Sequence, residues 1–293
     1  MNHEQDPATP QRAELNEVDA PRVAGSITGT DGGPNEHNGP SRVALAGDWH
    51  GNVDWVQRAI PLLHRFAPDV TQILHVGDFG YWPGRERKGF LAAVDYWAKT
   101  AGITSILVTP GNHEHWDRLN ALFGASQGEP VQISDVVTML PRGYRFTLSA
   151  RTFMSFGGAA SVDFEYRIPG ETWFRTEIPT DQDVARAIAA GPVDVLITHE
   201  TVDGGTRASQ RALDCNPLSW SLEALDYSAL SRGRVTWVWD ALRPKLLAHG
   251  HMHAPDFITL PDGRRVISLG CDRQERNMAV LNLRSLETEW VIE

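Results

Sequence analysis

Cysteine is scarce in this sequence, and long apolar runs are missing. Only two of the 293 residues are cysteines, Cys215 and Cys271, and they form no Cys-x-x-Cys pair. This argues against a disulfide framework and indicates a reducing compartment. No apolar run approaches the roughly 18 residues of a membrane span. The first residues, MNHEQDPATPQRAELNEVDAP, lack the apolar core of a secretory signal. We therefore expect a cytoplasmic protein with no membrane partner.

An excess of basic residues is also lacking. The chain has 27 Lys and Arg against 37 Asp and Glu, which gives a formal net charge of -10. This balance argues against a protein that coats nucleic acid or an anionic membrane surface, so long nucleic acid is an unfavoured partner. A small anionic substrate stays open, because bound metal cations can reverse the local field. The composition predicts no oligomeric state.

The chain divides into a polar tail and a longer globular region. Residues 1–40 are rich in Asp, Asn, Pro, Gly and Thr, and we expect them to form a disordered tail. Residues 41–293 are expected to form a single domain. Within it, RVALAGD, TQILHVGD and ITSILVTPGNHE are typical of buried strands, and they alternate with the predicted helices VDWVQRAIPLLHRFA and RKGFLAAVDYWAKTAG. This alternation predicts an α/β fold with a parallel sheet.

The second half of the chain predicts further elements. Residues 131–159 are expected to form an antiparallel patch of short strands, and DQDVARAIAA a helix with Asp181 as N-cap. PVDVLITHE is typical of a buried strand, and LSWSLEALDYSALSRG and VTWVWDALRP of two helices. The carboxyl-terminal region predicts hairpins, one of them with a Pro-Asp-Gly turn.

Polar side chains that can bind metals gather where predicted strands end. They are Asp48 and His50 in AGDWHG, Asp78 in VGDFG, Asn112 and His113 in PGNHE, His199 in ITHE, and His251 and His253 in GHMH. Sites in α/β sheets form at the carboxyl ends of strands, and residues two apart in extended backbone project to the same side. Oxygen and imidazole ligands suit Mn, Fe, Zn, Co or Ni. Taken singly, Asp48 could cap a helix, Asn112 could be a turn residue and His199 a core histidine.

Taken together, these five segments, in this order, resemble the signature blocks of the calcineurin-like metallophosphoesterase superfamily, in its bacterial and phage form. The resemblance implies a four-layer α/β/β/α sandwich with mixed sheets and two divalent metal ions. Manganese is the first expectation, with Fe, Zn or Ni as alternatives. By motif, Asp48, His50 and His253 would hold one ion, Asn112, His199 and His251 the other, and Asp78 would bridge both. His113 would be the catalytic residue near the leaving group.

The implied activity is hydrolysis of phosphodiesters, cyclic nucleotides among them, or of small phosphorylated substrates, through a metal-bridging hydroxide. The alternatives are a phosphomonoesterase or nucleotide phosphatase, a nuclease subunit, and a non-catalytic scaffold of the same fold. Two departures weigh against a protein Ser/Thr phosphatase. Residues 77–83, GDFGYWP, lack the second Asp and the Arg of that branch, and Pro110 replaces the Arg before GNHE. They also leave no candidate for the group that orients His113.

Four side chains outside the blocks are candidates for substrate binding. They are Arg85, His115, Arg167 and Trp173. Each also has a structural alternative: Arg85 could lie at a solvated helix start, and Trp173 could be a packing residue. His75 and His249 fit no ligand position, and we expect both to be strand histidines outside the metal site.

Overall fold

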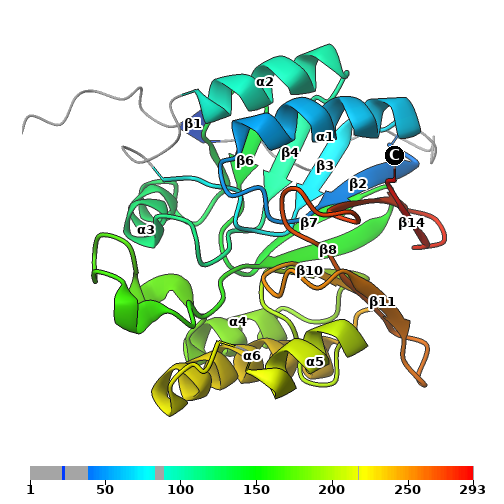
Figure 1. Cartoon of the computed structure of the whole chain (residues 1–293). Helices are drawn as coiled ribbons and strands as arrows, with labels where there is room; N and C mark the ends of the chain where they lie inside the picture. Colours follow the sequence, from blue (N-terminus) through cyan, green and yellow to red (C-terminus); the bar gives the residue numbers. More distant parts are fainter. Residues whose placement is uncertain (1–21, 24–38, 83–88, 217, 293) are drawn as a thin grey trace, which may run out of the picture.

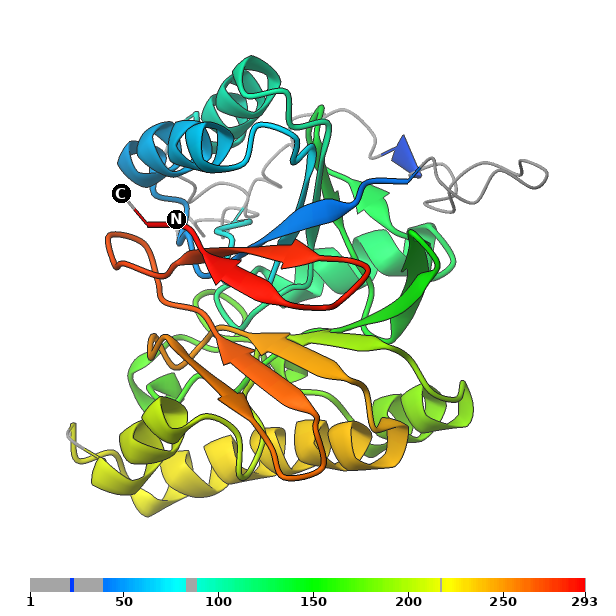
Figure 2. The ribbon, with the colours of Figure 1, turned by 90° about the vertical axis from the view of Figure 1, so that its right-hand side faces the viewer.

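Two mixed β-sheets lie face to face between two layers of helices. The computed structural model describes residues 22–23, 39–82, 89–216 and 218–292. Helices α1 and α2 cover the outer face of one sheet, and α4, α5 and α6 cover the outer face of the other (Figure 1). The same four layers are seen edge-on after a quarter turn (Figure 2). This confirms the predicted α/β/β/α sandwich.

The first sheet is built around parallel strands. In spatial order its eight strands are β1 (Arg22–Val23), β5 (Val131–Gln132), β6 (Val137–Met139), β4 (Ser105–Val108), β3 (Gln72–His75), β2 (Arg42–Ala46), β13 (Met278–Asn282) and β14 (Thr288–Trp290). Strands β6, β4, β3 and β2 are parallel, and β13 pairs with β2 in the opposite direction. The carboxyl ends of β2, β3 and β4 therefore lie at one edge of this sheet.

The second sheet repeats this plan with six strands. In spatial order they are β11 (Asp256–Thr259), β12 (Arg265–Ser268), β10 (Leu246–His249), β9 (Val195–Thr198), β8 (Arg151–Phe156) and β7 (Tyr144–Leu148). The central four strands, β12 to β8, are parallel, and antiparallel strands flank them on both sides. Strands β9 and β10 are neighbours, so the loops that follow them start side by side.

The helices bury one face each. They are α1 (Val53–Phe66), α2 (Phe90–Thr100), α3 (Trp116–Ala125), α4 (Asp181–Ala189), α5 (Arg207–Cys215) and α6 (Leu222–Leu242), with short 3-10 turns η1 (Phe164–Tyr166) and η2 (Arg175–Glu177). In α1 the buried residues Val56, Ile60 and Leu63 recur at helical spacing, and Asn52 caps the first turn. Pro61 lies inside α1 without ending it.

Three buried apolar clusters fill the spaces between the layers. One lies between α1, α2 and the first sheet, one between the two sheets, and one between the second sheet and α4 and α6. Strand β2 contributes to two of them, because Ala44 faces the helices and Val43 faces the other sheet. The predicted strands are therefore buried on both faces, as their continuous apolar sequences indicate.

The structure corrects several sequence-based expectations. The region 131–159 is not one antiparallel patch, because β5 and β6 belong to the first sheet and β7 and β8 to the second. Asp181 is not the N-cap of α4; Thr180 is, with a capping box to Asp183. The two helices expected between residues 218 and 244 are one helix, α6, and α5 was not predicted.

The polar tail is described only in part. Arg22 and Val23 form strand β1, which pairs with β5. Most of the remaining tail lies outside the described residues. The predicted hairpins are confirmed: β11 pairs with β12 and β13 pairs with β14. Within the described ranges, no helix combines the length and apolarity that a bilayer crossing requires.

Candidate metal centre

Loops from both sheets bring the polar side chains of the five sequence blocks together. Asp48 and His50 follow β2, Asp78 follows β3, and Asn112 and His113 follow β4. His199 directly follows β9, and His251 and His253 follow β10. The site therefore lies where the carboxyl edges of the two sheets meet, and not at the edge of a single open sheet.

The backbone of these loops is left-handed at four non-glycine residues of the blocks. The φ angles are +48° at His50, +48° at Asp78, +64° at His251 and +48° at His253. Non-glycine residues adopt this region at a cost, and such strain is often concentrated at functional sites. These φ angles also correct the expectation that the paired block residues lie in extended backbone. Residues two apart converge here because tight turns aim them, and not because the backbone is extended.

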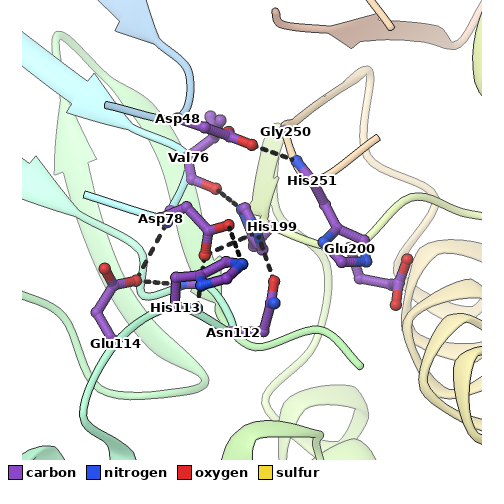
Figure 3. A network of polar contacts seen from close by, with 12 residues as sticks. Asp48, Val76, Asp78, Asn112, His113, Glu114, His199, Glu200, Gly250 and His251 are labelled. Atoms are coloured by element: carbon purple, nitrogen blue, oxygen red, sulfur yellow. Dashed lines mark hydrogen bonds and ion pairs between the residues drawn. The ribbon is translucent and has the colours of Figure 1, made fainter. Parts of the chain in front are cut away.

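Seven of the side chains form two adjoining groups. In the first, here the Asp48 cluster, one ligand atom each from Asp48, His50, Asp78 and His253 lie within 4.8 Å of one another. In the second, here the His199 cluster, the same holds for Asp78, His199 and His251. Asn112 joins the His199 cluster, because its Oδ1 lies 3.1 Å from Nε2 of His199. Asp78 belongs to both clusters, and Figure 3 shows it facing His199 and His113.

In the His199 cluster, three atoms that can accept hydrogen bonds face one another with no hydrogen between them. Nδ1 of His199 lies 2.8 Å from the Val76 carbonyl oxygen, which can only accept, so Nδ1 carries a proton. Nε2 then faces Oδ1 of Asp78 at 3.1 Å and Oδ1 of Asn112 at 3.1 Å. Three acceptors at such distances need a cation or an extra proton between them. The donor set, with nitrogen and oxygen and no sulfur, fits a divalent transition metal.

The Asp48 cluster shows the same need for a cation. Oδ2 of Asp48 lies 3.1 Å from Nε2 of His253 and accepts from the backbone N–H of His251. Its other oxygen, Oδ1, is buried and has no hydrogen-bond partner among the described residues. An orphaned carboxylate oxygen is costly to bury. Ligands for two adjoining cations are therefore present, and the chemistry of both clusters fits them.

Asp272 orients His50 from behind, and the sequence did not reveal it. Nδ1 of His50 lies 2.9 Å from Oδ1 of Asp272, and Asn52 donates to the other carboxylate oxygen. This leaves Nε2 of His50 free to face Asp78 at 3.5 Å. Carboxylates behind metal-binding histidines fix the ring and raise its basicity. Asp272 follows β12 and a glycine, which is the same signal that marked the other blocks, but the segment was assigned only to a hairpin.

Replacing Asp272 by alanine is expected to weaken metal binding by about 10- to 100-fold at the Asp48 cluster and to leave the His199 cluster nearly unchanged. The reason is that the His50 ring loses the acceptor that holds Nδ1–H. Isothermal titration with Mn²⁺ would separate the two sites. Asp262→Ala, at an exposed hairpin turn, is the matched control. Equal weakening at both sites would contradict this role of Asp272.

Neighbouring carboxylates raise the pKa of three of the four histidines in the two clusters, whereas burial lowers the pKa of the fourth, His251. Burial lowers the pKa of His50, but Asp272 and Asp78 outweigh it and raise the pKa to about 11. In the same way, burial is outweighed by Asp78 and Asp48 at His199, whose pKa rises to about 9. At His253, burial is outweighed by Asp48 and the thiol of Cys271, and the pKa rises to about 10.

Metal loading near pH 7.5 is therefore expected to release about three protons per chain, because imidazole binds a metal only when that nitrogen is deprotonated. All three pKa values lie above pH 7.5, so apparent metal affinity should increase as the pH rises from 6 to 9. Calorimetric titrations in buffers of different ionisation enthalpy would give the proton count as a slope. A slope of zero would show that the rings are neutral before metal binds.

Glu114 ties the second and third blocks together beneath Asp78. Its buried carboxylate accepts from the backbone N–H groups of Asp78, Gly80 and Gly111. Burial, with Asp78 as a second cause, raises the pKa of Glu114 to about 7. The packing here requires glycine: a Cβ on Gly111 would lie 2.2 Å from Oδ1 of Asp78. The acidic residue of the PGNHE block thus has a structural role behind the site.

Arg167 lies against His113 and supplies the neighbour that the sequence left unidentified. Its Nη2 lies 3.2 Å from Nε2 of His113, and its Nη1 lies 3.5 Å from Nδ1, so the guanidinium lies across the ring. Nε of Arg167 is 2.7 Å from Asp163. Nε2 of His113 is 4.0 Å from Oδ2 of Asp78, and the His113 side chain is 40% exposed. The ring of His113 therefore lies beside Asp78, with the guanidinium of Arg167 against it.

The other candidates for substrate binding lie in different places. Arg85 lies outside the described residues. His115 caps α3, and its ring stacks on Phe174 with centroids 4.5 Å apart. Trp173 is 8% exposed, and its indole N–H donates to Glu177, so it packs behind the segment that carries Arg167. The structure thus brings Arg167 to the site, leaves His115 as a prediction, and gives Trp173 a packing environment.

His249 and His75 are buried outside both clusters, as expected. His249 ends β10, and its ring nitrogens contact the Gly250 carbonyl and the Thr201 hydroxyl. His75 ends β3, and its ring packs edge-on against Trp49 and Phe79. Neither histidine belongs to a candidate metal group within the part of the chain that the structure describes.

Comparison with known proteins agrees with this geometry. A family model described as calcineurin-like phosphoesterase matches residues 41–255. A dimetal phosphatase from Danio rerio superposes with a TM-score of 0.51 at 12% identity, covering 87% of this chain and 98% of that one. TT1561 of Thermus thermophilus superposes with a TM-score of 0.50 at 13% identity, covering 86% and 99%. No curated protein matches the sequence. The motif order, the two joined clusters and the matched family model together show that this chain belongs to the calcineurin-like phosphoesterase family.

Proposed function

We propose that this protein hydrolyses phosphoesters at a two-metal centre, with phosphodiesters, cyclic nucleotides among them, and small phosphorylated metabolites as substrates. The observation that carries the proposal is the pair of ligand clusters that share Asp78. Asp48, His50 and His253 would hold one cation, and Asn112, His199 and His251 the other. When bound, two such cations bind phosphoryl oxygens, stabilise the charge that develops on them and activate water as a nucleophile.

The chain's own groups would act on the other side of the phosphorus. Nε2 of His113 is the ring nitrogen nearer Asp78, so a phosphate over the clusters would lie next to it. We assign His113 the transfer of a proton from Nε2 to the departing oxygen, after a phosphoryl oxygen has accepted the Arg167 N–H that faces Nε2 at 3.2 Å in the free protein. Burial lowers the pKa of His113, Asp78 opposes this shift and Arg167 adds to it. A protonated His113 therefore gives up its proton readily.

Arg167 would bind a phosphoryl oxygen. Its guanidinium already lies beside His113, held by Asp163 and by the carbonyl of Thr172 at 3.3 Å. Donors fixed in this way cost no reorganisation when the substrate binds. Manganese is the first choice of metal for tests, because oxygen and imidazole ligands suit it.

The assay uses the full chain loaded with Mn²⁺ and compares bis-p-nitrophenyl phosphate with p-nitrophenyl phosphate. A panel of cyclic nucleotides, dinucleotides and phosphomonoesters follows on the same preparation. We expect faster hydrolysis of the diester and its loss after chelation. Faster hydrolysis of the monoester would favour a phosphomonoesterase. If elemental analysis finds no metal after loading with Mn, Fe, Zn or Ni, the proposal fails and a non-catalytic scaffold takes its place.

Replacing Arg167 by alanine is expected to lower kcat/KM by about 10²- to 10³-fold, the usual cost of removing one preorganised donor. Metal content should not change, because the guanidinium contacts His113, Asp163 and Thr172, which lie outside both clusters. Steady-state kinetics with elemental analysis would test this. Arg186→Ala, an exposed arginine on α4, is the control. An activity equal to that of the wild type would remove Arg167 from the site.

A further inference from the structure

A buried glutamate lies beyond the metal clusters and receives only hydrogen-bond donors. Glu177 is fully buried. Its Oε1 accepts from the Ser161 backbone N–H at 2.6 Å, from the Trp173 indole at 3.0 Å and from the Tyr227 hydroxyl at 3.1 Å. Its Oε2 accepts from the Ser161 hydroxyl at 2.8 Å. Burial raises the pKa of Glu177 to about 7, and the donors from Ser161, Trp173 and Tyr227 act against that shift.

The Ser161 hydroxyl fixes the direction of the next hydrogen bond, to Asn112. A hydroxyl has one hydrogen and can donate only once. Because Ser161 donates to Glu177, its oxygen can only accept from its other neighbour, Nδ2 of Asn112 at 3.2 Å. Above pH 7, where Glu177 is a carboxylate with no hydrogen to give, it therefore sets the direction of both hydrogen bonds, from Ser161 to Glu177 and from Asn112 to Ser161.

The orientation of the Asn112 amide matters for metal binding. The two ends of an asparagine amide have nearly the same size and shape, so packing alone does not decide which end points where. With Nδ2 directed to Ser161, Oδ1 faces Nε2 of His199 at 3.1 Å and enters the His199 cluster. The oxygen end can bind a cation, whereas the NH2 end has no lone pair to offer.

We propose that Glu177 is a positioning residue that sets the direction of the hydrogen bonds from Asn112 through Ser161, and thereby turns the Asn112 oxygen toward the cation of the His199 cluster. This inference rests on the proposed two-metal function, because it assigns Asn112 as a ligand. The backbone of Glu177 is itself held in place: Nη2 of the half-buried Arg142 donates to its carbonyl at 2.8 Å. A substitution at position 177 therefore changes chemistry more than position.

The first test variant reverses the direction of the hydrogen bonds between residue 177, Ser161 and Asn112 and keeps all three side chains in place. In Glu177→Gln, three donors still converge at the Oε1 position, so the amide oxygen stays there and the new NH2 faces the Ser161 hydroxyl. The hydroxyl then accepts from residue 177 and can use its own hydrogen only by donating to Asn112, which favours the flipped Asn112 amide with its NH2 toward the cation. We expect Glu177→Gln to raise the Mn²⁺ Kd of the His199 cluster by about 100-fold or more. This is the upper end of the loss in metal affinity when a residue that supports a metal ligand is changed.

Ser161→Ala removes the link instead of reversing it. Nothing then opposes the orientation of Asn112 that the cation prefers, so we expect a rise in Kd of about 10-fold or less. The decisive variant is the double change, Ser161→Ala with Glu177→Gln. It carries the same glutamine but no reversed link, so its Kd should return to that of Ser161→Ala. A purely structural loss at position 177 would not be rescued in this way.

Two measurements read out these variants without relying on activity. Isothermal titration gives the Kd of each site, and electron paramagnetic resonance of the protein with two equivalents of Mn²⁺ detects a coupled pair of ions. Thermal unfolding checks that each variant is folded, and Glu129→Gln, at an exposed position, is the matched control. The inference is overturned if the double variant binds Mn²⁺ as weakly as Glu177→Gln. It is also overturned if Ser161→Ala binds Mn²⁺ more weakly than Glu177→Gln. If the wild type binds no second Mn²⁺, the proposed function itself fails.

Discussion

Replacing Asp78 by asparagine is expected to lower kcat/KM for phosphoester hydrolysis by about 10³-fold or more, since the stabilisation supplied by a metal pair amounts to several kcal/mol. Asp78 is 1% exposed and belongs to both clusters. Asparagine keeps its size but loses its charge, so both cations should bind more weakly. The backbone N–H of His113 donates to Oδ1 at 2.8 Å, which keeps the amide oxygen at that position.

In Asp78→Asn, the loss of metal affinity should be larger at the Asp48 cluster than at the His199 cluster. With the amide oxygen at the Oδ1 position, near His199, the new NH2 occupies the Oδ2 position, 3.5 Å from Nε2 of His50. The Asp48 cluster then loses its shared ligand. Elemental analysis of the variant should therefore find about one metal per chain under conditions that load two into the wild type. Asp54→Asn, at the exposed start of α1, is the control, and full occupancy of both sites would contradict the bridging role.

Replacing His113 by alanine is expected to lower kcat by about 10²- to 10⁴-fold while both metals remain bound, because the ring lies beside Asp78 but belongs to neither cluster. The size of the loss should depend on the leaving group. A p-nitrophenolate departs without a proton, whereas an alkoxide needs one. Kinetics with a p-nitrophenyl diester and an alkyl diester would therefore show a larger loss for the alkyl substrate.

Equal losses for both substrates would assign His113 an electrostatic role without proton transfer. The control is His64→Ala, at an exposed position on α1. A loss of metal in the His113→Ala variant would instead place His113 among the ligands. The three outcomes are distinct, because metal content and the leaving-group dependence of kcat are measured separately.

The sequence indicated which side chains the fold brings into the two clusters, because those residues carry a local signal. Each follows an apolar strand, and all but the ITHE block have glycines that permit a close approach, as at Gly111 beside Asp78. The α/β class followed from the alternation of strands and helices, and the four-layer sandwich followed from the resemblance to the family. Neither inference needs knowledge of contacts between distant segments, and both were available from short stretches of chain.

The supporting residues carry no such signal. Glu177 lies in a 3-10 turn after an irregular segment, and only the folded chain shows that Ser161 and Tyr227 meet there. Arg167 could be named as a candidate, but its contact with His113, 54 positions earlier, could not be predicted. The single helix α6 was predicted as two helices, but Gly233, where the first was expected to end, lies inside it.

The two clusters also have a mechanical consequence for the sandwich. Each contains ligands from both sheets: Asp48, His50 and Asp78 with His253 in one, and Asp78 with His199 and His251 in the other. A cation in either cluster would act as a cross-link between the two halves of the molecule at one edge. Since binding to the folded state alone stabilises it by about 4 kcal/mol at 1,000 times the Kd, metal supply would set how firmly the two sheets stay joined.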